Sequence, residues 1–234
     1  MKNSLLFRLL GVLAVYIGLK YYGGEVGEKI LYPVNLLVTF LHELGHALGA
    51  VLTGGRVDRL VVNADGSGVT YTAGGSRGII LMGGYIGSAL LGNLLFYIGA
   101  RWKNAASTTI ALLCAAMVFS AFWWQGSMFS TMFLVVFAIG TYLISRFTSL
   151  DREILMFLGL ASILYIIQDF RVGPSSDLEK YAELMVIFPK VVWMYIWLGI
   201  ALLLCFLNLR LIFKSGGYAD VEKGDDTILD NTKY

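Results

Sequence analysis

Long apolar runs alternate with short polar connections along most of the chain. A membrane-spanning helix needs roughly 20 mostly apolar residues, and runs of that length occur at about seven places. They cover residues 5–22, 30–52, 78–100, 105–124, 127–146, 152–169 and 187–213. The connections between them are too short to hold a separate soluble domain. The pattern therefore predicts one all-α polytopic membrane domain over residues 1–213.

Three segments depart from this pattern. Residues 56–62 and 68–72 flank a loop that contains Asp65-Gly66, which is typical of a β-hairpin that follows the second apolar run. Residues 174–179 resemble a capping box, which predicts a short helix before the last run, on the same side of the membrane as the hairpin. Residues 214–234 are polar and lack an apolar period, so we expect a mobile C-terminal tail.

Composition excludes a soluble enzyme. Hydrophobic residues make up 57% of the chain and the mean hydropathy is +0.72, more than a soluble core can hide. The formal net charge is only +2, and no basic cluster with interleaved aromatic residues occurs, so we expect no nucleic-acid partner. Lysine and arginine residues are divided about evenly between the loops expected on the two sides of the membrane, so the positive-inside rule does not determine the orientation of the chain.

One motif carries metal chemistry. His42 and His46 are the chain's two histidines, and both fall in the pattern His-Glu-x-x-His inside an apolar run. Residues four apart share one face of a helix, so both imidazoles reach one zinc ion while Glu43 stands beside the metal-bound water as its general base. Zinc lowers the pKa of that water and polarises a scissile carbonyl. Ionisable residues inside a membrane also indicate function.

A catalytic zinc ion takes a third protein ligand, and a carboxylate is the expected donor because no further histidine is present. If the apolar runs alternate in direction, Asp169 and Asp177 both emerge on the motif's face. Asp177 has another explanation, as an acidic residue in the first turn of a helix. We therefore favour Asp169 and keep Asp177 as the alternative.

Other interpretations of these residues remain open. The histidines and Glu43 are also compatible with interhelical polar contacts, a pore lining or an ion pathway. A catalytically inactive protein could bind partner helices through residues 83–92, where small residues recur at four-residue spacing. Such spacing more often serves close helix packing, and a hydrogen bond between helices would account for Asn93.

Several motifs together resemble the site-2 protease family of intramembrane zinc metallopeptidases, in its compact bacterial and plant peptidase-like branch. They lie at residues 42–47, 53–55, 66–70, 84–88 and 175–183. The resemblance implies a zinc metalloendopeptidase that hydrolyses membrane-embedded protein substrates, with zinc held by two histidines and an aspartate. It also implies a β-element that pairs with unwound substrate. We expect an integral membrane protein of the bacterial inner (cytoplasmic) membrane, and the sequence gives no oligomeric state.

The chain departs from the wider family in one respect. That family carries its third ligand in a Leu-Asp-Gly motif, which does not occur in this sequence. The third ligand is therefore inferred from Asp169 and Asp177 rather than transferred from the family. No inserted PDZ-type domain is present that would indicate how substrates are selected.

Overall fold

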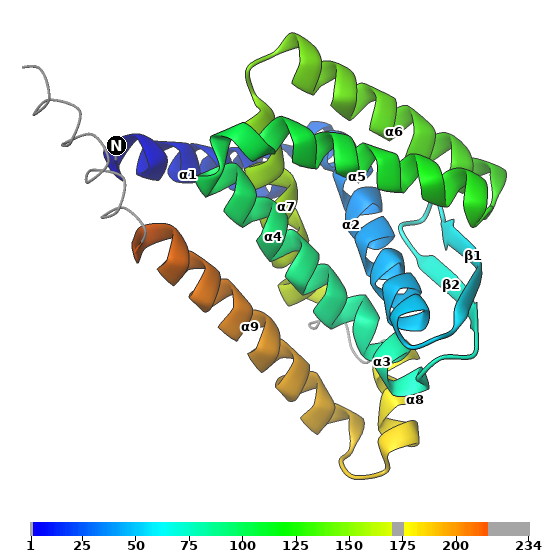
Figure 1. The fold of residues 1–234 in the computed structure, drawn as a ribbon. Helices are drawn as coiled ribbons and strands as arrows, with labels where there is room; N and C mark the ends of the chain where they lie inside the picture. Colours follow the sequence, from blue (N-terminus) through cyan, green and yellow to red (C-terminus); the bar gives the residue numbers. More distant parts are fainter. Residues whose placement is uncertain (1, 170–175, 215–234) are drawn as a thin grey trace, which may run out of the picture.

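The computed structural model describes residues 2–169 and 176–214, which form helices and one β-hairpin (Figure 1). The elements are α1 (Lys2–Ile17), η1 (Gly18–Tyr22), α2 (Gly24–Leu52), β1 (Arg56–Val62), β2 (Gly68–Ala73), α3 (Arg77–Met82), η2 (Gly83–Gly87), α4 (Ser88–Arg101), α5 (Lys103–Trp123), α6 (Met128–Phe147), α7 (Asp151–Asp169), α8 (Ser176–Met185) and α9 (Lys190–Lys214). The two η elements are single π-helical turns that continue neighbouring helices.

Six helical stretches in the described residues are long and apolar enough to cross a membrane, which confirms the predicted polytopic helical fold. They are Leu5–Tyr22, Gly24–Leu52, Arg77–Arg101, Lys103–Trp123, Met128–Phe147 and Lys190–Lys214. The remaining predicted run forms α7, which is not among the six. Its first turn carries Asp151, Arg152 and Glu153, so it is more polar at that end.

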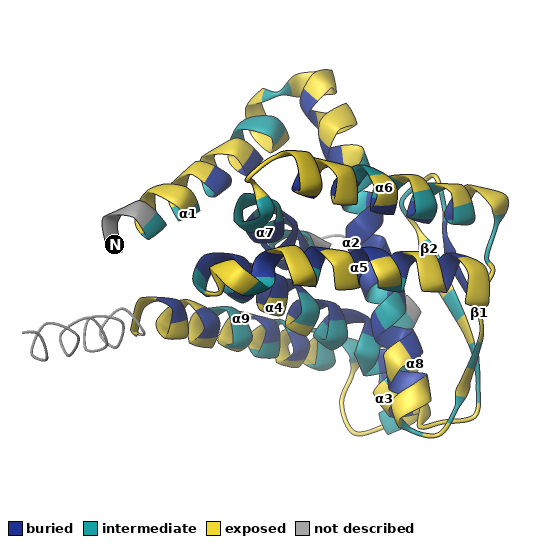
Figure 2. Ribbon diagram, turned by 45° about the horizontal axis from the view of Figure 1, so that its top comes forward, coloured by how far each residue is buried: buried dark blue, intermediate teal, exposed yellow. Residues whose placement is uncertain are grey.

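α2 occupies the interior of the bundle. Of the residues in its most apolar stretch, 72% are buried, compared with 28% for α6 and 22% for α9. Figure 2 shows this contrast as a mostly dark blue α2 among helices with yellow outer faces. Four leucines of α2 and Phe40 pack into the main apolar core with residues of α4, α5 and α7; the leucines are Leu31, Leu36, Leu37 and Leu41. The segment with His42, Glu43 and His46 therefore lies on the most buried of the six candidate spans.

The β-hairpin forms where the sequence predicts it. β1 and β2 pair antiparallel, with Leu60 opposite Thr70. The chain reverses at Gly66, whose φ of +89° lies in the region that glycine adopts without steric cost. Thr39 of α2 donates a 2.7 Å hydrogen bond to the Gly66 carbonyl, and Leu60 N donates to the Trp124 carbonyl at 3.0 Å. These contacts fix the hairpin against α2 on one side and the α5–α6 connection on the other.

The glycine-rich segment at residues 83–92 is used for packing inside the bundle. A Cβ atom on Gly45 of α2 would collide with the Gly83 carbonyl, so the two backbones touch. Further along, Gly92 of α4 lies against Ser162 of α7. Asn93 is buried and accepts a 2.9 Å hydrogen bond at Oδ1 from Asn208 of α9. These contacts agree with the packing role expected for this segment and with the interhelical hydrogen bond expected for Asn93.

Candidate metal centre

His42, Glu43 and His46 lie on the C-terminal half of α2, with the two histidines one helical turn apart. Their imidazole ring centroids are 4.8 Å apart. The side chain of His46 is buried and that of His42 is partly exposed. Glu43 is buried, with 4% of its surface exposed. The motif therefore presents two imidazoles to one side of α2 and a buried carboxylate beside them.

The backbone of η2 lies directly over these histidines. A Cβ atom on Gly84 would lie 2.5 Å from Nε2 of His42 and 2.5 Å from Nε2 of His46. Any side chain at this position would therefore occupy the space that the two nitrogens face. Sequence reasoning assigned Gly84 to helix packing, and the structure adds that its missing side chain leaves room between the imidazoles.

The carboxylate that reaches the histidines is Asp177, in the first turn of α8. α8 is anchored through Leu178 and Tyr181, both of which are buried against residues of α3, η2 and α9. The Tyr181 ring packs edge-on against Trp197 at 5.0 Å between centroids. This apolar attachment directs Asp177 toward α2.

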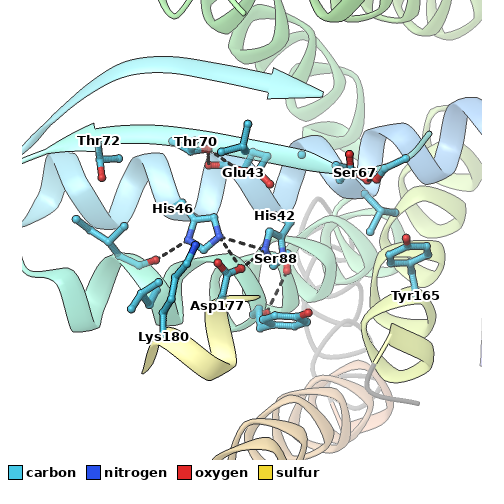
Figure 3. Close-up of a pocket in the computed structure, with 18 of the residues that line it drawn as sticks. His42, Glu43, His46, Ser67, Thr70, Thr72, Ser88, Tyr165, Asp177 and Lys180 are labelled. Carbon is cyan, nitrogen blue, oxygen red and sulfur yellow. Dashed lines mark hydrogen bonds and ion pairs between the residues drawn. The ribbon is translucent and has the colours of Figure 1, made fainter. Parts of the chain in front are cut away.

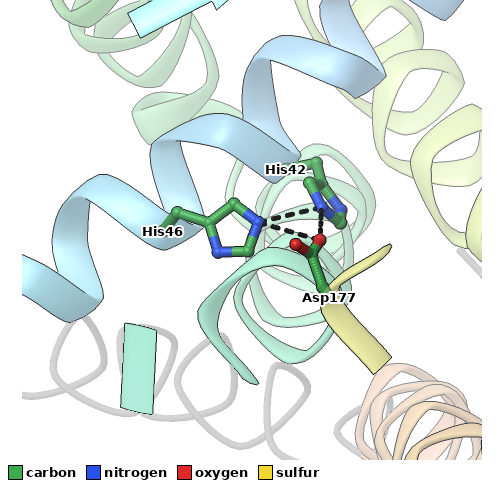
Figure 4. A group of neighbouring side chains, drawn as sticks. All are labelled: His42, His46 and Asp177. Carbon is green, nitrogen blue, oxygen red and sulfur yellow. Dashed lines mark hydrogen bonds and ion pairs between the residues drawn. The ribbon is translucent and has the colours of Figure 1, made fainter. Parts of the chain in front are cut away.

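Three donor atoms converge on one point (Figure 4). Asp177 Oδ2 lies 3.1 Å from His42 Nε2 and 3.2 Å from His46 Nε2, and the two nitrogens are 3.1 Å apart. Zinc binds nitrogen and oxygen donors at about 2.0–2.1 Å, so tetrahedral geometry sets its donors about 3.3 Å from one another. The spacing and the donor types therefore fit a zinc ion held by three protein ligands.

The tautomer of His46 supports the same conclusion. Its Nδ1 lies 2.6 Å from the Ile80 carbonyl oxygen, which only accepts hydrogen bonds, so Nδ1 carries the hydrogen. In the neutral ring, Nε2 then presents a lone pair to the Asp177 oxygen. Two lone pairs at this distance repel unless a cation lies between them or the ring is protonated. Metal-ligating histidines commonly make this kind of contact to a carbonyl through the other nitrogen.

Asp177 is held in its ionised form. Burial by itself raises the pKa of this carboxyl, but hydrogen bonds and positive charge from the His42 and His46 rings in their protonated form outweigh burial. The pKa of Asp177 therefore lies well below its ordinary value. The carboxylate is ionised at neutral pH, which is the form that binds metal ions.

Glu43 faces the hairpin rather than α8. Thr70 of β2 places its hydroxyl oxygen 2.6 Å from Glu43 Oε2 and 3.0 Å from the main-chain oxygen of the same residue. The sequence places Thr70 in one of the motifs shared with the family but assigns it no role. The signal that identifies it is the alternation along β2, which puts Gly68, Thr70 and Thr72 on one face of the strand.

These residues line a cavity of about 710 Å³. It extends along β2 and is lined by residues of α2, α3, η2, α4, α7 and α8, and Figure 3 shows the histidines, Glu43 and Asp177 together on its wall. Arg77 and Lys180 add positive charge to the lining, and Asp65 adds negative charge. The cavity thus combines a candidate metal site, a buried carboxylate and one face of a β-strand.

The sequence-based candidates for the third ligand have different outcomes. Asp177, the alternative, is the carboxylate that the structure brings to both histidines. Asp169, the preferred candidate, is the last residue of α7, and its side chain lies outside the part of the chain that the structure describes. The preference for Asp169 thus stays a prediction, while the geometry favours Asp177.

Comparison with known proteins identifies the family. The sequence model of the Peptidase M50B-like family matches residues 9–208, which include His42, Glu43, His46 and Asp177. No curated protein and no solved structure matches the chain. The match covers most of the sequence, including all of the elements that form the cavity. The chain therefore belongs to the Peptidase M50B-like family, a site-2 protease family.

Proposed function

We propose that this protein is a zinc-dependent endopeptidase that hydrolyses peptide bonds of membrane-embedded proteins. The observation that carries the proposal is the convergence of His42 Nε2, His46 Nε2 and Asp177 Oδ2, each pair 3.1–3.2 Å apart, beside Glu43. Family membership supports a membrane metallopeptidase. In this proposal the three residues hold zinc, and Asp177 takes the position that sequence reasoning assigned to Asp169.

Each site residue has a distinct role in the proposed reaction. Zinc, when bound, polarises the scissile carbonyl and acidifies water. Glu43 accepts the proton of the attacking water and passes it to the leaving amine nitrogen, as a general base and then a general acid. Its burial keeps that proton transfer away from bulk solvent.

The hairpin offers a way to bind the substrate. The described sheet has two strands, so one edge of β2 pairs with β1 and its other edge carries no strand. An extended peptide can add to such an edge through main-chain hydrogen bonds. A substrate helix protects its carbonyls with internal hydrogen bonds, so it must unwind before attack. Strand addition along β2 would stabilise the unwound segment beside the histidines.

The packing inside the bundle favours the enzyme hypothesis over the hypothesis of an inactive helix-binding factor. The small residues that such a factor would offer to partner helices, in the segment 83–92, are in contact with the protein's own α2 and α7. The cavity, by contrast, contains the histidines, Glu43 and Asp177 together. The proposed location is the inner membrane of a bacterium, with membrane proteins as substrates.

Zinc content tests the proposal. We expect about one zinc per chain by elemental mass spectrometry of the detergent-purified protein, lost in His46→Ala and Asp177→Ala. Asp169→Ala is the matched control and should keep its zinc. A wild-type protein that binds no zinc when metal is supplied would refute the proposal. Loss of zinc in Asp169→Ala but not in Asp177→Ala would restore the sequence-based choice of ligand.

A further inference from the structure

Two residues of β2 enclose the carboxylate of Glu43. Thr70 contacts both the Oε2 atom and the main-chain oxygen of Glu43, at 2.6 and 3.0 Å. A hydroxyl has a single hydrogen, and the shorter contact is the one to the carboxylate, where a charge-assisted bond is stronger. Thr70 therefore donates to Oε2 of Glu43.

The other carboxylate oxygen lies against Gly68. A Cβ atom on Gly68 would be 2.5 Å from Glu43 Oε1 and 2.7 Å from Glu43 Cγ, so a larger residue would displace the side chain. Strand β2 thus limits the carboxylate at one oxygen by a hydrogen bond and at the other by close contact. A glutamate side chain with three rotatable bonds acquires a defined orientation in this way.

We propose that Thr70 is a positioning residue, which orients Glu43 for proton transfer and acts through that carboxylate rather than on the substrate. This inference rests on the proposed peptidase function. It gives the hairpin a second role, because the strand that offers an edge to the substrate also holds the general base. Groups that support a reactive side chain in this way commonly change activity by about 10- to 100-fold when removed.

The hairpin does not depend on Thr70 for its own attachment. Val62 N donates to Ser130 Oγ at 3.1 Å, and Thr39 Oγ1 donates to the Gly66 carbonyl at 2.7 Å. Leu60 and Val62 are fully buried in the main core. Replacing Thr70 by valine, which has nearly the same shape and favours strands, therefore removes the hydroxyl without releasing the hairpin.

The test compares Thr70→Val with Thr70→Ser, which keeps a hydroxyl, and with Thr109→Val as a matched control. Thr109 lies in α5, where its hydroxyl bonds to the Ala105 carbonyl of its own helix at 2.8 Å. Zinc content is measured first in all variants. Cleavage of a library of single-span reporter peptides in detergent micelles follows, and kcat and KM are determined on the peptide that the wild type cleaves fastest.

We expect Thr70→Val to keep wild-type zinc and KM while kcat falls by about tenfold or more, with Thr70→Ser close to wild type. A second measurement needs no peptide. Calorimetry measures the affinity of the zinc-loaded protein for benzohydroxamic acid. This affinity should be lower in Thr70→Val, because a metal-bound hydroxamate donates a hydrogen bond to the base beside the metal.

Three results would overturn the inference. Unchanged kcat and unchanged hydroxamate affinity in Thr70→Val would reject the positioning role while leaving the peptidase proposal intact. An equal loss in Thr70→Ser would show that packing, not the hydroxyl, is what matters. Absence of zinc from the wild type would reject the peptidase proposal itself, and the role of Thr70 with it.

Discussion

The cavity's two walls meet the same stretch of α2 with different chemistry. On the α8 side, two imidazole nitrogens and the Asp177 oxygen face one another, an arrangement that needs a cation or protonated rings. On the β2 side, Glu43 and Thr70 form a donor–acceptor contact that is complete within the protein. The α8 side therefore suits binding of a cation, and the β2 side fixes the orientation of the Glu43 side chain. Metal occupancy and proton transfer should therefore be separable by mutation.

The largest expected effect comes from filling the space between the imidazoles. In Gly84→Ala the new methyl group would lie 2.5 Å from both Nε2 atoms. We expect zinc to fall from about one per chain to near zero, because the methyl carbon and the metal cannot share this space.

Gly199→Ala in α9 is the control for the loss of a glycine, since a Cβ there meets nothing within 4 Å. Elemental analysis and the helical circular dichroism signal should be measured together. Gly84→Ala protein that is folded and retains full zinc would contradict the assigned position of the metal.

The second effect comes from Glu43, the residue of α2 that faces β2. Glu43→Gln keeps the shape of the side chain but removes the base, so zinc should stay near the wild-type level. Cleavage of the reporter peptides should fall by roughly 10²–10⁴-fold, the usual contribution of general acid–base catalysis. Activity within a few-fold of wild type would mean that another group accepts the proton.

The smallest effect concerns the attachment of α8. Tyr181→Ala removes a buried ring that packs against Trp193 and Trp197, so Asp177 loses a fixed position. We expect the zinc dissociation constant to rise by about tenfold, as for other supports of metal ligands. Tyr181→Phe keeps the ring and should bind zinc like the wild type. Competition with a chromogenic chelator measures both, and equal affinities would contradict the anchoring role.

Much of this architecture is predictable because strong local signals agree with the fold. Long apolar runs specify the helices, and Asp65-Gly66 between strand-forming segments specifies the hairpin. His42, Glu43 and His46 are recognisable because helical spacing alone brings them to one site. α7 is the exception among the spans, since its charged first turn and buried apolar residues suit a helix packed within the bundle.

The remaining site residues depend on tertiary packing that the sequence does not encode locally. Asp177 has the local pattern of a first-turn acid, and only the docking of α8 onto α3 and α9 brings it to the histidines. Recognising Thr70 as a neighbour of Glu43 requires knowledge of the strand register and of the position of β2 over α2. Gly84 resembles a packing glycine until the imidazoles are in place opposite it.

The sequence separation of the proposed ligands has a consequence for biogenesis. His42 and Asp177 are 135 positions apart, and α3 to α7 are synthesised between them. A nascent chain that has inserted only its first helices carries two imidazoles and no carboxylate at the metal position. On the proposed ligand set, zinc loading waits for α8 to leave the ribosome. On the proposed function, hydrolytic activity would then begin only when nearly the whole bundle has been assembled in the bilayer.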